Sequence, residues 1–179
     1  MSSLESLLGR VIVTPPGAVI ERARALARAE DATDRNRFAP GHFTASGLVV
    51  SPDRSSLLLV HHRRLGRWVQ PGGHIDPGDG TPLEAARREV LEETGVATTP
   101  LVEALFAIDI HGIPSRGPEP GHEHFDLRFA LTGVTDEVTP ADEVRDAVWA
   151  SWEDLGDFEV DDSVARAAMV LRGMTQRPR

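Results

Sequence analysis

The chain has 179 residues, a length that suits one domain with a sizeable core, and a formal net charge of −9. This acidic balance argues against binding of a nucleic-acid polymer, which needs a basic face, but not against a small phosphorylated ligand neutralised by metal. The absence of cysteine excludes disulfides and cysteine-based zinc sites. With no apolar run of about 18 residues and no signal-peptide pattern, we expect a cytoplasmic protein that neither spans a membrane nor is secreted.

The first part of the chain predicts one helix followed by strands. Residues 17–31 carry apolar side chains at helical spacing, and residues 33–41 form a polar connector with a Pro-Gly break. Strand-like segments follow at residues 43–51, 56–63 and 68–70. The first two are separated by Pro52-Asp53-Arg54, which is typical of a hairpin.

The clearest helix signals lie between residues 81 and 95. Thr81 is the expected N-cap, Pro82 takes the first helical position, and Glu84 completes a capping box. Gly95 is a natural helix stop. The sequence therefore predicts a well-capped helix of about three turns.

The last part of the chain again mixes strands and a helix. The expected strands are residues 98–110, 123–131 and 146–152, and the expected helix is residues 162–174. Strands with helices before and after them fit an α/β protein, an α/β/α sandwich with a mixed sheet.

Three glutamates share one arc of the capped helix. Glu89, Glu92 and Glu93 stand at i, i+3 and i+4. Like charges at this spacing destabilise a helix by a few tenths of a kcal/mol per pair, and carboxylates in the last turn oppose the helix dipole by about 0.3–1 kcal/mol each. A bound hard cation such as Mg²⁺ or Mn²⁺ reverses both penalties. We therefore interpret the arc as a metal site rather than a solvated face.

Residues 73–96 resemble the Nudix box, written G-x5-E-x7-R-E-U-x-E-E-x-G-U with U a bulky apolar residue. The second half matches at every position from Arg88 to Val96. In the first half Asp79 stands where the family has glutamate, and Gly80 adds one residue before the helix. The resemblance implies a Nudix-type sandwich over residues 41–179. Residues 1–40 then form an N-terminal helical extension, either a packed appendage or an element of a homodimer.

The resemblance also implies a function. Nudix enzymes are Mg²⁺- or Mn²⁺-dependent hydrolases of a diphosphate linked to another moiety, typically a nucleoside diphosphate derivative. Glu89, Glu92 and Glu93, with the carbonyl of Gly73, are then the expected metal ligands. Arg88 is expected to bridge Glu84 and Glu92. The candidates for the general base are Glu89, Asp126 and His124, in that order.

All seven histidines lie between residues 42 and 124. His122, His124, Asp126 and Arg128 alternate along one strand, so their side chains share a face. We expect this strip to line the substrate cleft, with Asp126 or His124 orienting water and Arg128 meeting phosphate. A zinc site on His122 and His124 lacks a clear third ligand in the sequence. His74 follows the glycine pair of the box and is expected near the active site.

Two further segments are candidates for substrate contact. Arg63 and Arg67 belong to a basic turn just before the box, which is either a phosphate-binding element or a solvated hairpin tip. Residues 111–121 form a long Pro/Gly-rich loop, a common form for specificity elements and also for surface excursions.

Two other functions use the same fold. Isomerisation of isoprenoid diphosphates is disfavoured, because that activity looks for a cysteine that this chain lacks. A non-hydrolytic ligand sensor usually has lost a box carboxylate or carries a fused DNA-binding domain. Here all box glutamates of the helix are present and no helix-turn-helix pattern is evident, so hydrolysis is the favoured interpretation.

Overall fold

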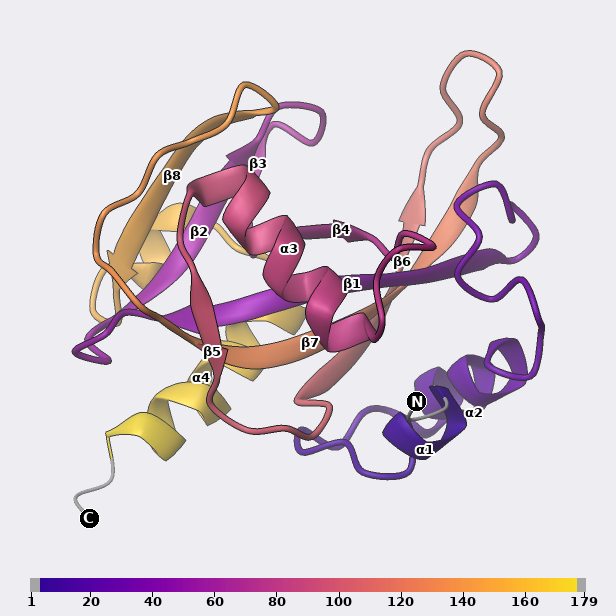
Figure 1. The fold of residues 1–179 in the computed structure, drawn as a ribbon, viewed down its shortest axis with the longest axis horizontal. Helices are drawn as coiled ribbons and strands as arrows, with labels where there is room; N and C mark the ends of the chain where they lie inside the picture. The colour runs from indigo at the N-terminus through magenta and orange to yellow at the C-terminus, as the bar shows by residue number, and fades with distance from the viewer. Residues whose placement is uncertain (1–3, 177–179) are drawn as a thin grey trace.

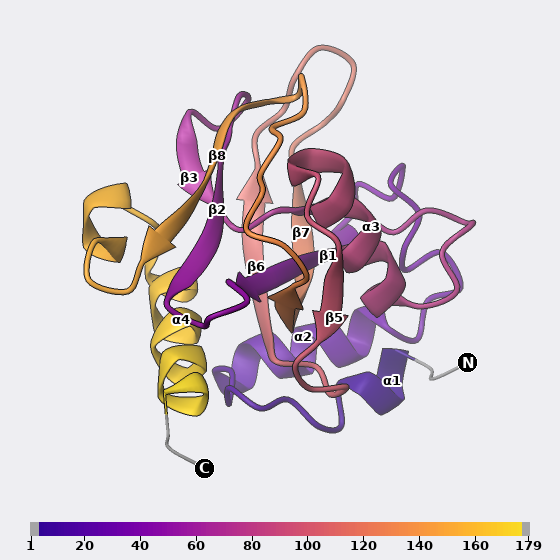
Figure 2. The same ribbon diagram turned by 60° about the vertical axis from the view of Figure 1, so that its left-hand side comes forward.

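The computed structural model describes residues 4–176, and the fold is a curled sheet with helices on both faces (Figures 1 and 2). Its strands are β1 Gly41–Val50, β2 Ser56–His62, β3 Arg67–Val69, β4 Gly72–His74, β5 Thr98–Pro100, β6 Ala107–Ile113, β7 His122–Gly133 and β8 Val144–Ser151. Its α-helices are α1 Leu4–Leu7, α2 Gly17–Leu26, α3 Pro82–Thr94 and α4 Asp162–Thr175, with a 3₁₀ turn at Leu155–Phe158.

The sheet is mixed. Its strand order is β3-β2-β1-β7-β5, while β4 pairs with β1, β6 with β7 and β8 with β2. The long central pair β1 and β7 is parallel, and the other pairs are antiparallel. In Figure 1, β4 and the hairpin of β6 and β7 lie beside the same end of β1, so polar residues from four strands can meet there.

Alternation along β1 explains the two layers of the core. Phe43, Ala45 and Val49 belong to the apolar cluster that includes α3 and the N-terminal helices. Leu48 and Val50 point to the opposite cluster, which contains the buried face of α4. β1 is buried on both faces, and the face of Leu48 and Val50 is polar at His42, Thr44 and Ser46 in the first half of the strand. The predicted α/β/α sandwich is confirmed.

One predicted strand is wrong. The expected strand 98–110 is divided into β5 and β6, with residues 101–106 between them. This stretch is bound by a distant part of the chain, because the N–H groups of Ile12 and Val13 donate to the carbonyls of Leu105 and Phe106 at 3.1 and 2.8 Å. Tertiary pairing rather than local propensity decides the break.

The N-terminal segment packs against the rest of the chain. Leu8, Ala23 and Leu26 are buried in the same cluster as α3. The N–H of Phe43 donates to the carbonyl of Ala32 at 2.8 Å, and Arg22 pairs with Glu123 of β7. The described part of residues 1–40 is thus a packed appendage, shorter in helix than expected because α2 ends at Leu26. The division at residue 40 and a role in a homodimer stay predictions.

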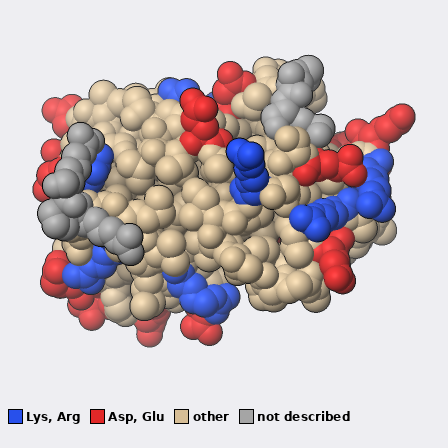
Figure 3. All heavy atoms as spheres, turned by 90° about the horizontal axis from the view of Figure 1, so that it is seen from below, with Lys and Arg blue, Asp and Glu red and all other residues tan. Residues whose placement is uncertain are grey.

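The surface carries charges of both signs. In the view of Figure 3, acidic and basic side chains are interspersed around the rim, and most of the central area is uncharged. Among the described residues, no helix combines the length and apolar composition needed to cross a membrane.

Candidate active site on the acidic helix

The caps of α3 match the sequence prediction. The N–H of Glu84 donates to the hydroxyl of Thr81 at 3.2 Å, and Pro82 is the first helical residue. Gly95 ends the helix with φ 72°, in the left-handed region, and its N–H donates to Leu91 at 2.8 Å. These local signals fix the register that presents the three glutamates.

Glu93 is the most enclosed of the three carboxylates. It is 5 % exposed, and its Oε2 accepts the N–H of Gly72 at 2.9 Å. Burial raises the pKa of Glu93 to about 8. The backbone hydrogen bond from Gly72 offsets this only in part, and the neighbouring acids raise the pKa further. The last turn of α3 is thereby tied to the start of β4.

Glu89 lies against Gly73. A Cβ atom at position 73 would stand 2.6 Å from Oε2 of Glu89, so only glycine admits this approach. Burial raises the pKa of Glu89, and the hydrogen bond from Arg88 at 2.9 Å offsets this in part. Glu92 is 52 % exposed and also meets Arg88 at 2.9 Å. Two of the three box carboxylates are therefore poorly neutralised by the protein itself.

Arg88 joins the box loop to the helix. Its Nε and Nη2 donate to the two oxygens of Asp79 at 3.0 and 2.9 Å, a bidentate pair. Its Nη2 also donates to the carbonyl of His74 at 2.9 Å, while Nη1 reaches Glu89 and Glu92. The carboxylates raise the pKa of the guanidinium still further above its usual range.

The expected bridge from Arg88 to Glu84 is not the arrangement found. The carboxylate of Glu84 instead accepts the hydroxyl of Thr81 at 3.2 Å. Asp79 takes the place at Arg88, with a side chain only 8 % exposed. The pair lowers the pKa of Asp79, and Oδ2 of Asp79 also accepts the N–H of Asp76 at 2.8 Å. Asp79 therefore clamps the loop onto α3.

The strip on β7 lies opposite polar residues of β1. In the parallel register His42 faces His124, Thr44 faces Asp126, and Ser46 faces Arg128. His42, Thr44 and Ser46 were not predicted as site residues, and the sequence only predicted a strand over this part of the chain. The alternation of polar and apolar residues in a buried strand is the signal that was available for them.

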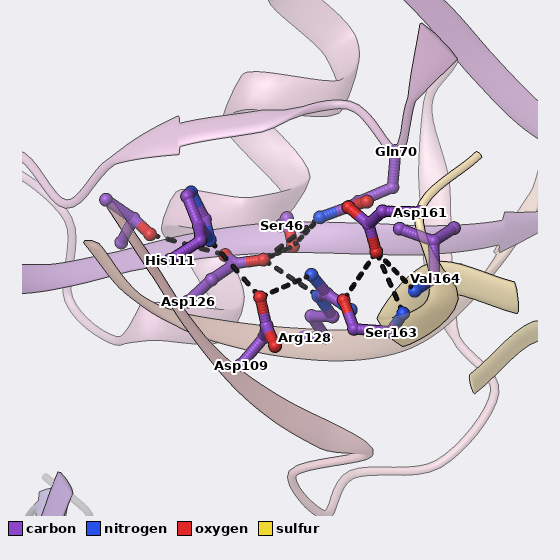
Figure 4. Close-up of polar contacts among 10 residues, drawn as sticks. Ser46, Gln70, Asp109, His111, Asp126, Arg128, Asp161, Ser163 and Val164 are labelled. Atoms are coloured by element: carbon purple, nitrogen blue, oxygen red, sulfur yellow. Dashed lines mark hydrogen bonds and ion pairs between the residues drawn. The ribbon is translucent and has the colours of Figure 1, made fainter. Parts of the chain in front are cut away.

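Asp126 and Arg128 form a buried polar network rather than a free acid and a free cation (Figure 4). Asp126 Oδ2 accepts hydrogen bonds from Ser46 Oγ at 2.8 Å, Gln70 Nε2 at 3.0 Å and Arg128 Nε at 2.9 Å. Arg128 is 2 % exposed and also reaches Ser163 at 2.8 Å and Asp109 at 3.3 Å. A phosphate at Arg128 would have to replace one of these partners.

A single cleft of about 920 Å³ collects most of the predicted site. The predicted residues that line it are Arg63, Arg67, Gly73, His74, Glu89, Glu92, Glu93, His124, Asp126 and Arg128. The expected loop 111–121 is shorter than predicted, because residues 111–113 pair with β7 as the end of β6. The remaining hairpin tip contributes Pro114, Ser115, Arg116 and Glu119 to the cleft. Arg63 is anchored by its Nε to the carbonyl of Val144 at 3.0 Å, whereas Arg67 is exposed.

The family model described as NUDIX domain matches residues 41–171. The chain belongs to this family. The predicted membership of the Nudix superfamily is therefore confirmed.

The relatives of this NUDIX chain match it over limited lengths. A putative 8-oxo-dGTP diphosphatase of Bacillus subtilis (strain 168) is 44 % identical over 48 residues, covering 27 % of this chain and 32 % of that protein. An RNA pyrophosphohydrolase of Erythrobacter litoralis (strain HTCC2594) is 37 % identical over 87 residues, covering 49 % and 42 %. The chain thus spans less than half the length of these curated relatives.

A solved structure agrees in fold over a larger share. The crystal structure of a NUDIX-family hydrolase from Clostridium perfringens is 26 % identical, with a TM-score of 0.56. The match covers 74 % of this chain and 97 % of that one. The sandwich around the box is therefore the family's own architecture.

The NUDIX box residues fit a hard divalent cation. The side-chain donors on this arc of α3 are carboxylate oxygens, the ligands that Mg²⁺ and Mn²⁺ prefer. The raised pKa values of Glu89 and Glu93 reflect carboxylates that lack a sufficient positive partner within the protein. The carbonyl of Gly73 as a further ligand stays a prediction.

Proposed function

We propose that this NUDIX chain is a divalent-metal-dependent hydrolase that cleaves a diphosphate linkage in a nucleoside diphosphate derivative or a similar small metabolite. The observation that carries the proposal is a pair of undercompensated carboxylates, the buried Glu93 and the partly buried Glu89, at the wall of a cleft. The names of two curated relatives support the substrate class, since one is a putative 8-oxo-dGTP diphosphatase and the other an RNA pyrophosphohydrolase.

The three box glutamates are the proposed holders of Mg²⁺ or Mn²⁺. When bound, the ion neutralises phosphate oxygens and lowers the pKa of water. The protein's own part is positioning: Gly72 fixes Glu93 through its N–H, and Arg88 fixes Glu89 and Glu92. Preorganised ligands of this kind need little rearrangement when substrate arrives.

Glu89 is the proposed proton acceptor among the three candidates. Asp126 Oδ2 accepts three hydrogen bonds from buried partners, so this oxygen is already occupied. Burial, together with the other histidines around it, lowers the pKa of His124 to about 2, which makes its ring a poor base at neutral pH. Glu89 accepts a hydrogen bond from Arg88 through Oε1 alone. Asp126 then acts as a positioning residue.

Substrate contacts are assigned to the opposite wall. Arg63 lies on the turn after β2 and Arg67 begins β3. Both line the cleft and are the proposed partners of phosphate groups, with His74 beside the box. Arg128 is proposed to position Asp126 rather than to bind substrate, since its N–H groups already bind Asp126, Asp109 and Ser163. The separation of a basic rim from an acidic helix suits a polyphosphate bridged by metal.

A panel assay tests the proposal. Purified protein is incubated with nucleoside triphosphates, dinucleoside polyphosphates and nucleotide sugars, with Mg²⁺ or Mn²⁺, and the products are separated by chromatography. We expect hydrolysis of at least one class, lost in Glu93→Gln and kept in Glu103→Gln, an exposed matched control. Binding without turnover for every substrate, or an active Glu93→Gln at saturating metal, contradicts the proposal.

A further inference from the structure

Four imidazole rings, those of His42, His74, His122 and His124, gather at the end of the cleft where β1, β4 and β7 lie side by side. A fifth ring, that of His111, has its centroid 5.6 Å from that of His124, and its Nδ1 lies 3.3 Å from Asp109. The ring of His42 has its centroid 5.2 Å from that of His74, 5.2 Å from that of His122 and 4.9 Å from that of His124. Sheet pairing builds the group, because His42 is the register partner of His124 and β4 places His74 next to Thr44. These residues lie outside the carboxylate arc of α3.

The ring nitrogens of the group converge. One nitrogen each from His42, His74 and His124 lies within 4.8 Å of the others. His42 is fully buried, and its Nδ1 lies 3.1 Å from the carbonyl of Arg37. A carbonyl only accepts hydrogen bonds, so this contact places the proton of His42 on Nδ1 and leaves a lone pair on Nε2.

The Nε2 atom of His42 has no hydrogen-bond partner within residues 4–176. A buried acceptor without a partner is rare and costs stability, so it calls for an explanation. A histidine whose other nitrogen donates to a backbone carbonyl is the usual arrangement of a metal ligand. Both properties of His42 are explained by a cation at Nε2.

His122 repeats the pattern at the edge of the group. Its Nδ1 lies 3.0 Å from the carbonyl of Pro120, and its Nε2 lies 3.3 Å from Nε2 of His124. Nitrogens bound at about 2.0–2.1 Å to a tetrahedral zinc ion are about 3.3–3.4 Å apart. The observed separation fits two ligands of one ion, and it is also that of a hydrogen bond between the two rings.

We propose that His42, His74 and His124 form a zinc-binding site, with His122 at the fourth position. Imidazole nitrogens select a borderline ion such as Zn²⁺ rather than Mg²⁺. The site is thus chemically separate from the oxygen-ligand site of the box. The sequence offered His122 and His124 without a third ligand, and the sheet supplies it from β1 and β4.

A zinc ion here would fix the end of β4 beside the box. His74 directly follows Gly73, and its carbonyl accepts the guanidinium of Arg88 at 2.9 Å. A zinc ion that joins the ring of His74 to β1 and β7 would therefore restrain β4, the strand in which Gly73 contacts Glu89. This is a positioning role, separate from the proposed hydrolysis.

Metal binding tests the site without reference to activity. Metal-free protein is titrated with Zn²⁺ against a chromophoric chelator, and bound zinc is counted by elemental analysis. We expect one tightly bound ion per chain, and visible absorption of tetrahedral intensity with Co²⁺. His124→Ala and His74→Ala are each expected to weaken zinc binding by at least about 100-fold, more than the loss of an outer partner. His62→Asn, in the same cleft but outside the group, is expected to bind as wild type.

The outcomes separate the alternatives. Glu93→Gln should keep its zinc, so loss of zinc in that variant would place the ion on the box carboxylates and overturn the proposal. Wild-type affinity for zinc in both His74→Ala and His124→Ala would also overturn the proposal. A wild-type protein that binds no zinc would overturn it as well, and the cluster would then be a set of stacked imidazole rings without a metal. X-ray absorption of the zinc-loaded wild type, with scattering from several imidazoles expected, decides the question even if a variant fails to fold.

Discussion

Glu89 packs its carboxylate onto the Cα of Gly73, at a place where a methyl group would stand 2.6 Å from Oε2. The contact joins β4 to α3 and sets where this box carboxylate points. Glycine is needed at position 73 because Glu89 lies so close, and not because the backbone there has a positive φ. The position of the Glu89 carboxylate therefore depends on the absence of a side chain at Gly73.

Gly73→Ala is therefore expected to displace Glu89 and to lower kcat by about 100-fold, the cost of misplacing a reacting group by about 1 Å. Gly78→Ala is the matched control, because a Cβ at Gly78 meets nothing within 4 Å. Steady-state kinetics on the two variants provide the measurement, with circular dichroism to compare their folds. Equal activity in both would mean that Glu89 adapts and that its packing on Gly73 has no catalytic consequence.

Burial of Glu93 predicts a pH effect on the metal-free protein. Its pKa is raised from 4.5 to about 8, so the folded state holds the proton that the unfolded state releases. The contribution to stability is complete below pH 4.5 and is lost as pH rises to about 8. The free energy of unfolding should fall over this window, relative to Glu93→Gln, by on the order of a few kcal/mol.

Urea denaturation at several pH values in the presence of chelator measures this effect. Glu103→Gln should follow wild type, and addition of Mg²⁺ should flatten the wild-type profile because a cation replaces the missing positive partner. Identical pH profiles for wild type and Glu93→Gln would show that the carboxylate is hydrated despite its small exposed area.

Local signals predicted the helix of the box well, and tertiary pairing explains what they missed. The caps at Thr81 and Gly95 are contacts between near neighbours, so they are visible in the sequence. The break at residues 101–106 depends on Val13 and its neighbours, and the meeting of His42 with His124 depends on parallel pairing of distant strands. No periodicity within one segment contains that register.

The same reasoning applies to Arg128. Its alternation with Asp126 on β7 placed it correctly on the cleft face, but two further partners that bind it come from other elements. Asp109 lies on β6, and Ser163 lies on α4. A sequence pattern identifies a polar face, whereas the partners that occupy each donor become known only from the fold.

The hairpin tip between β6 and β7 is expected to set substrate choice. Residues 114–116 and Glu119 line the cleft and are exposed. Replacing residues 114–120 with a Gly/Ser linker of equal length should change KM or substrate ranking and leave the affinity for Mg²⁺ near wild type. An unchanged ranking across the nucleotide panel would assign the tip to the surface alone.

Asp79 and Gly80 offer the sharpest test of how this chain departs from its family's box. Asp79 forms the bidentate pair with Arg88 and is therefore expected to position the loop rather than to bind metal. Asp79→Asn should cost about 10–100-fold in activity, the usual loss for an outer partner, and less than Glu93→Gln. The exposed Asp136→Asn serves as the matched control and should behave as wild type.

The inserted glycine is tested by restoring the family spacing. Gly80 is exposed, and a Cβ there would meet only the carboxylate end of the exposed Glu84, with Oε2 at 2.6 Å. Deleting Gly80 alone should pull the short Asp79 carboxylate away from Arg88 and reduce activity. Deleting Gly80 together with Asp79→Glu should recover part of it, because the extra methylene replaces the reach of the lost residue. If the double variant is no more active than the variant that lacks only Gly80, the longer side chain does not compensate for the shorter loop. Asp79 then pairs with Arg88 only in the loop that contains Gly80.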